Sequence, residues 1–182
     1  LMDFNNTQIA FSMKSARDLR NAKFLFSTIS SPALVKTFKA LTLAALKIRF
    51  PVSWIVKPTL YRQFVGGETL EECTKSLKLL SDYNIKSVLD YSAEGGSTRE
   101  DVLRTYQETI RSIDYARSNP VIAFTVFKPT GMAVGPLDAC SAEEMESFRE
   151  RFFALCRKAY DNDVRILIDA EHFATQDIID AI

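Results

Sequence analysis

The sequence predicts an α/β protein, with an N-terminal helical arm over residues 1–62 and the first three βα units of a (β/α)8 barrel over residues 63–182. Short apolar runs alternate with longer amphipathic runs, and three of the amphipathic runs open on a helix-capping pattern. The apolar runs are nearly continuous, which is typical of strands covered on both faces in a parallel sheet. Helical connections between such strands favour a parallel α/β architecture.

The arm is distinguished by its charge. Residues 1–62 carry ten Lys and Arg against two acidic residues, a net charge of +8, whereas residues 63–182 carry −8. From Ser31 to Phe50, apolar residues recur at helical spacing opposite Lys36, Lys39 and Lys47, which predicts an amphipathic basic helix. Such a helix either packs on the main domain or lies on an anionic membrane surface. Pro51 and Pro58 then indicate a connector.

Three helices and three strands follow in alternation. Each helix is predicted to begin with a hydroxyl residue followed three positions later by glutamate. The helices and their opening pairs are residues 69–83 (Thr69 and Glu72), 97–118 (Ser97 and Glu100) and 141–160 (Ser141 and Glu144). The apolar strands follow them over residues 85–89, 121–127 and 164–168.

The segment after the first strand favours a barrel over a dinucleotide-binding fold. Residues 91–96 (YSAEGG) lack the glycine order of the dinucleotide fingerprint. A complete barrel takes about 250 residues, and this chain ends within the helix expected after its third strand. We therefore expect a truncated barrel, whose apolar inner face and open edge lead the chain on its own to self-associate.

Composition excludes several other classes of protein. Net charge is zero over 182 residues, so no basic excess indicates nucleic-acid binding. The three cysteines lack metal-ligand spacing, and no apolar run approaches the length of a membrane span. We expect no metal site. Because the chain begins Leu1-Met2-Asp3 without a secretory leader, we expect a cytoplasmic protein.

Charged residues follow each predicted strand at the point where it ends. Asp90 and Glu94 follow the first strand, Lys128 the second, and Asp169 and Glu171 the third. Because the carboxyl ends of parallel strands form the rim of the active site in such folds, we expect Lys128 to lie between acidic residues. This arrangement is either a structural ion-pair layer or a lysine held in its charged form to bind a substrate carboxylate.

Four segments around these residues resemble the proline dehydrogenase family in order and spacing. They are FVGGETL (64–70), LDYSAE (89–94), FKPTG (127–131) and LIDAE (167–171). The opening DFNNTQIAF (3–11) is similar to the start of bacterial members. Together the four segments span about 110 residues, although each one is short.

The resemblance implies a distorted (β/α)8 barrel that holds FAD and oxidises L-proline to pyrroline-5-carboxylate, with electrons passed to a membrane quinone. By matching position, Lys128 and Asp169 are the implied catalytic and cofactor-binding residues. Lys128, Asp90 and Glu171 are the implied substrate-binding residues. Since the family draws most flavin contacts and its carboxylate-binding arginines from later segments, we expect this chain alone to be inactive. Delivery of electrons to quinone implies peripheral contact with the inner membrane, for which the basic helix is suited.

Two other functions remain open at this stage. A lysine at a strand end between acidic residues is also the arrangement of Schiff-base lyases and aldolases. Alternatively, the helical arm and the open sheet edge belong to a non-catalytic interaction module.

Overall fold

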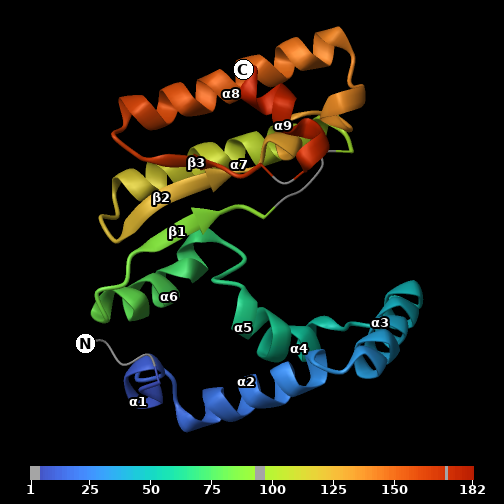
Figure 1. The fold of residues 1–182 in the computed structure, drawn as a ribbon, viewed down its shortest axis with the longest axis vertical. Coiled ribbons are helices and arrows are strands. Elements are labelled where there is room, and N and C mark those ends of the chain that lie inside the picture. Colours follow the sequence, from blue (N-terminus) through green and yellow to red (C-terminus); the bar gives the residue numbers. More distant parts are fainter. Residues whose placement is uncertain (1–4, 93–96, 171) are drawn as a thin grey trace. The chain divides into compact units, whose positions relative to one another are not determined.

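The computed structural model describes residues 5–92, 97–170 and 172–182 (Figure 1). The chain forms two compact units, Leu1–Leu79 and Leu80–Ile182. The division predicted after residue 62 was placed where the net charge changes, whereas these units are defined by compactness. It therefore stays a prediction.

The first unit is helical. Its elements are α1 (Thr7–Ala10), α2 (Ala16–Ile29), α3 (Pro32–Lys47), α4 (Ser53–Val56), the π-helical turn η1 (Lys57–Tyr61), α5 (Arg62–Phe64) and most of α6 (Leu70–Asp82). The helix predicted between Ser31 and Phe50 is confirmed as α3, which begins with a proline in its first turn. The apolar residues Leu34, Phe38 and Leu41 of α3 are exposed.

The connector predicted from Pro51 and Pro58 is largely helical instead. Residues 53–64 form α4, η1 and α5 in succession. Pro58 lies near the start of η1, where the wider π turn accommodates a residue without an N–H donor.

The second unit holds a parallel sheet. Its elements are β1 (Ser87–Asp90), α7 (Arg99–Arg117), β2 (Ile122–Phe127), the 3-10 turns η2 (Pro129–Met132) and η3 (Leu137–Ala139), α8 (Ala142–Asp161), β3 (Ile166–Ile168) and α9 (Phe173–Asp180). Within the described residues, the sheet has the order β1-β2-β3, and both neighbouring pairs are parallel. The prediction of an α/β fold with three adjacent parallel strands is confirmed.

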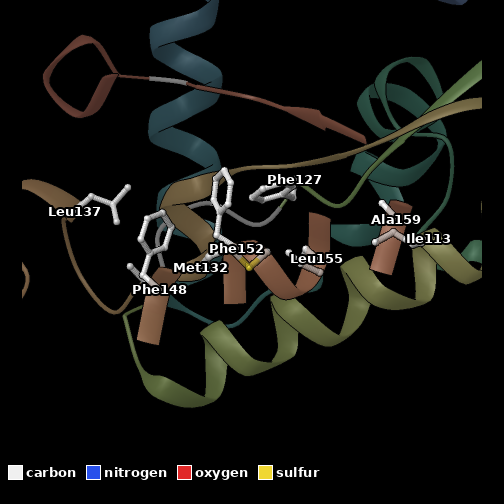
Figure 2. Packing of buried hydrophobic residues seen from close by; sticks show 9 residues of the cluster. Ile113, Phe127, Met132, Leu137, Phe148, Phe152, Leu155 and Ala159 are labelled. Carbon is white, nitrogen blue, oxygen red and sulfur yellow. The ribbon is translucent and has the colours of Figure 1, made fainter. Parts of the chain in front are cut away.

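One face of this sheet packs against α7 and α8. The buried cluster joins β2, both helices and the loop after β2 through Ile113, Phe127, Met132, Ala133, Leu137, Phe148, Phe152, Leu155 and Ala159 (Figure 2). The rings of Phe127 and Phe152 meet edge to face with centroids 5.2 Å apart. Because side chains alternate across a strand, Thr125 and Phe127 face these helices, and Val126 and Lys128 face the other way.

The caps of the helices differ in part from the predicted pairs. Helix α7 is capped by Thr98 and Asp101, which bond each other's backbone N–H groups, so the predicted pair of Ser97 and Glu100 was wrong by one residue. Both pairs satisfy the sequence pattern, and the start of the helix selects between them. At α6, Thr69 Oγ1 accepts a hydrogen bond from Glu72 N at 3.2 Å, as predicted.

Candidate functional site

Three of the predicted site residues lie on the face of the sheet opposite α7 and α8. The register pairs Asp90 with Val126, Val126 with Leu167, and Phe127 with Ile168. Asp90, Val126 and Leu167 thus form one row across the three strands. Lys128 directly follows β2, two residues beyond Val126, and Asp169 directly follows β3, two residues beyond Leu167. Two residues along a strand restore the same face, so all three side chains belong to one face of the sheet. We call it the site face, and define it by Val88, Asp90, Val126, Lys128, Leu167 and Asp169.

Lys128 and Asp169 form an ion pair. Lys128 Nζ lies 3.7 Å from Asp169 Oδ2, and the side chains are 10% and 49% exposed. The strand pairing continues between them, because Asp169 N donates a hydrogen bond of 3.0 Å to Phe127 O. The two residues are therefore fixed relative to each other by backbone as well as by charge. A nearly buried ammonium beside a more exposed carboxylate can receive an anionic group from the solvent side.

Asp90 lies one row closer to the start of the strands than Lys128 and Asp169. Its Oδ2 accepts a hydrogen bond from Ser92 Oγ at 3.2 Å. Ser92 was not predicted from the sequence, although a serine two residues after an aspartate is a frequent partner in turns. Glu94 and Glu171, the other predicted acidic residues, lie outside the described residues.

The site face is apolar around these charges. Val88 and Leu167 are exposed on the outer strands, and Val126 is buried on the central strand. Nearer the strand starts, the Arg165 guanidinium lies over the Phe124 ring, 5.8 Å from its centroid. The face thus presents an apolar floor with polar groups gathered at the carboxyl ends of the strands.

Cys73 and Cys156 give no sign of nucleophilic chemistry. Burial raises the pKa of the Cys156 thiol, and it also raises that of Cys73, where Glu72 and Glu71 add to the effect. Both thiols therefore stay protonated at neutral pH, and the thiol is a poor nucleophile. Among residues 5–92, 97–170 and 172–182, no three His, Cys, Asp or Glu side chains are grouped to hold a metal ion.

In the described part of the chain, no helix is both long enough and apolar enough to cross a membrane.

Comparison with known proteins identifies the family. The sequence model of the family described as proline dehydrogenase matches residues 73–182. This range includes the three strands and the residues that follow each strand. The chain belongs to the proline dehydrogenase family. The match covers Asp90, Lys128 and Asp169 and three of the four segments, and it confirms the resemblance to this family.

Individual relatives agree with this assignment. The chain is 29% identical over 127 residues to the carbapenem antibiotics biosynthesis protein CarD of Pectobacterium carotovorum subsp. carotovorum, covering 64% of this chain and 34% of that protein. It is 31% identical over 113 residues to mitochondrial proline dehydrogenase 1 of Bos taurus, covering 61% of this chain and 19% of that protein. The chain therefore spans about a third or less of the length of these relatives.

A solved structure shares the fold. Proline utilization A (PutA) from Bdellovibrio bacteriovorus, inactivated by N-propargylglycine, matches 96% of this chain and 20% of its own, with a TM-score of 0.59 and 16% identity. None of these comparisons supports the Schiff-base lyase or the interaction module considered from the sequence.

Proposed function

We propose that the complete protein is an FAD-dependent proline dehydrogenase, which oxidises L-proline to pyrroline-5-carboxylate. The observation that carries this proposal is the Lys128–Asp169 ion pair on the site face of a chain that belongs to the family. The ammonium of Lys128 supplies the positive charge that a substrate carboxylate needs, and its low exposure strengthens that attraction.

The proposal includes the finer architecture. The three strands and their helices are the first units of a (β/α)8 barrel, in which the site face lines the interior. The parallel order β1-β2-β3 and the packing of α7 and α8 on a single face support this. The fold shared with PutA supports it too.

Asp169 orients the ammonium of Lys128 through their ion pair. We assign Asp90 to the floor of the substrate pocket, one row below Lys128, and Glu171 to its rim on the basis of its position after the third strand. Asp90, Lys128 and Asp169 lie toward the carboxyl ends of the strands and the rest of the site face is apolar, so the apolar ring of proline rests on Val126 while its carboxylate meets Lys128.

The residues on the site face fit a flavin. Lys128 Nζ is a charged donor at the edge of an apolar floor, which suits a planar ring system with carbonyl and nitrogen acceptors. Lys128 and Asp169 would hold its reactive end. When bound, FAD supplies the acceptor for the two electrons and the hydrogen that leave the proline ring.

A lysine substitution tests the proposal. In the complete, flavin-loaded protein we expect Lys128→Met to lower kcat/KM for proline by at least about 100-fold, because a charged contact to the carboxylate is lost. Lys158→Met is the matched control, since Lys158 pairs with Asp114 at 2.6 Å between α8 and α7, away from the site. Equal activity of the two variants contradicts the role of Lys128. Borohydride trapping of a carbonyl substrate on Lys128 instead indicates the Schiff-base alternative.

We further propose that the arm meets an anionic membrane surface, where the enzyme passes electrons to quinone. Helix α3 exposes Leu34, Phe38 and Leu41, and its lysines at 36, 39 and 47 are also exposed. Apolar side chains together with lysines on an exposed helix favour insertion at the headgroup boundary.

Vesicle binding tests this contact. We expect the triple change of Lys36, Lys39 and Lys47 to Glu to weaken binding of the complete protein to vesicles with anionic lipid by at least tenfold, because about 1 kcal/mol is available per basic residue. The same change of the exposed residues Lys75, Lys78 and Lys86 alters net charge equally and serves as the control. Equal weakening by both triple variants contradicts a specific role for α3.

A further inference from the structure

Glu144 does not complete the capping box that the sequence predicts for α8. Ser141 Oγ accepts a hydrogen bond from Glu144 N at 3.2 Å, so the first half of the box is present. The Glu144 carboxylate instead accepts a hydrogen bond of 3.0 Å from Val134 N, ten residues earlier in the loop after β2. The Glu144 carboxylate, which would accept from the Ser141 backbone N–H in a complete capping box, thus binds the loop instead.

Arg151 holds the same loop from two turns further along α8. Its Nε donates a hydrogen bond of 2.7 Å to Met132 O, and its Nη2 donates to Glu144 Oε1 at 2.5 Å. The Arg151 and Glu144 side chains are only 13% and 22% exposed. One ion pair therefore fixes a backbone carbonyl and a backbone N–H on either side of Ala133. We call this pair the α8 latch.

The latched loop begins at Lys128. Gly131 N donates a hydrogen bond of 3.0 Å to Lys128 O, which closes the turn η2, and Arg151 holds Met132 at the end of that turn. Lys128 is consequently held from one side by β2 and from the other by a turn anchored on α8. Met132 and Ala133 are fully buried. Figure 2 shows Met132 within the buried cluster, so the carbonyl that Arg151 holds belongs to a residue of the core.

Stability alone does not account for a charged pair at this place. Replacement of a largely buried ion pair by apolar residues of similar volume is often neutral or stabilising, because two charges lose their hydration. What the pair provides, and apolar residues do not, is directed hydrogen bonding to two named backbone groups. Such bonds fix the path of the chain to a fraction of an ångström, and that tolerance matters next to a reacting group.

We propose that Glu144 and Arg151 are positioning residues, which act through the loop after β2 to hold Lys128 against the substrate carboxylate. The inference rests on the proposed function of Lys128. Both residues lie on α8, which packs on the face of the sheet opposite the site face.

The experiment compares three variants of the complete flavoprotein. Arg151→Met removes both donors, and Glu144→Gln keeps an oxygen for Val134 N while it removes the charge. Arg149→Met is the matched control, because Arg149 lies on the same helix in an ion pair with Glu146, at 3.7 Å, whose side chains are 46% and 69% exposed.

We expect Arg151→Met to raise KM for proline by about tenfold with less than a threefold change in kcat, and Glu144→Gln to act in the same direction. Hydrogen exchange of the peptide that covers residues 129–134 is expected to accelerate at least tenfold, while the peptide of β2 is unchanged. In a Lys128→Met background, Arg151→Met is expected to have no further effect on KM, because the latch acts through that lysine. Arg149→Met is expected to change none of these quantities.

Two results overturn the inference while leaving the proposed function intact. Given an active wild type, they are an Arg151→Met variant whose loop exchange is faster but whose KM is unaltered, and a KM effect of Arg151→Met that adds fully to that of Lys128→Met. A wild type whose flavin is not reduced by proline overturns the proposed function itself. Hydrogen exchange in the variants then separately decides whether the latch holds the loop.

Discussion

At the scale of single residues, Thr125 carries a fully buried hydroxyl that lacks a hydrogen-bond partner among the described residues. Its side chain is fully buried on the face of β2 that meets the helices, and no acceptor or donor reaches Oγ1 within the described part of the chain. Thr109 on α7 is equally buried, but its Oγ1 donates a hydrogen bond of 2.9 Å to Thr105 O. The two hydroxyls are therefore equally buried, and they differ in whether they form a hydrogen bond.

This difference predicts opposite effects of the same substitution. Thr125→Val is expected to raise the free energy of unfolding by about 1 kcal/mol, because it removes an unpaired buried hydroxyl at nearly constant volume. Thr109→Val is expected to lower it by about 0.5 to 1 kcal/mol, since it breaks a bond. Chemical denaturation measures both changes. Destabilisation of similar size in the two variants would show that Thr125 has a partner in solution.

That Lys128, Asp169 and Asp90 lie near one another was predictable from the sequence, because their positions depend only on where apolar strands end. The contacts of Arg151 with Met132 and Glu144 were not, because they depend on how the loop after β2 folds onto α8. The pattern of apolar and charged residues within a single helix does not indicate that path.

At the scale of elements, the predicted helices and strands agree with the structure to within a few residues, and the disagreements lie at their ends. Helix α2 was not predicted, although Ser15 and Asp18 form a capping box at its start. The short turns η2 and η3 were not predicted either, because 3-10 turns of this length lack a periodic apolar pattern.

The start of α7 offers a test of which residue caps the helix. Thr98→Ala is expected to destabilise the protein by about 1 kcal/mol, because Thr98 Oγ1 accepts from Asp101 N at 3.1 Å. Ser97→Ala is the neighbouring control and is expected to have little effect. Thermal unfolding of the two variants measures the difference. A larger loss in Ser97→Ala would restore the pair first predicted from the sequence.

At the scale of the whole molecule, the site face leaves apolar side chains exposed. Leu167 on this face and Leu103 on α7 have the same exposed fraction, 44%. They differ in surroundings, because Leu167 lies on the strand opposite Val126 and on the same face as the exposed Val88. An extended apolar face of this kind promotes association, whereas a single exposed leucine does not.

We expect the 182-residue chain, expressed by itself, to self-associate through the site face and to show no proline-dependent flavin reduction. Leu167→Lys is expected to reduce its apparent mass in light scattering, and Leu103→Lys to leave it unchanged. A wild-type chain that is monomeric at all accessible concentrations would contradict this, as would equal effects of the two lysines.

Because side chains alternate along β2, the site depends on whether the number of residues inserted into or deleted from this strand is odd or even. Phe127 lies in the core and Lys128, its immediate neighbour, lies on the site face. Insertion or deletion of one codon between residues 122 and 127 would turn an ammonium toward the aromatic cluster and a phenyl ring toward the site face. A change of two codons would preserve the orientation of both. Length variation in this strand among functional genes should therefore occur in even steps.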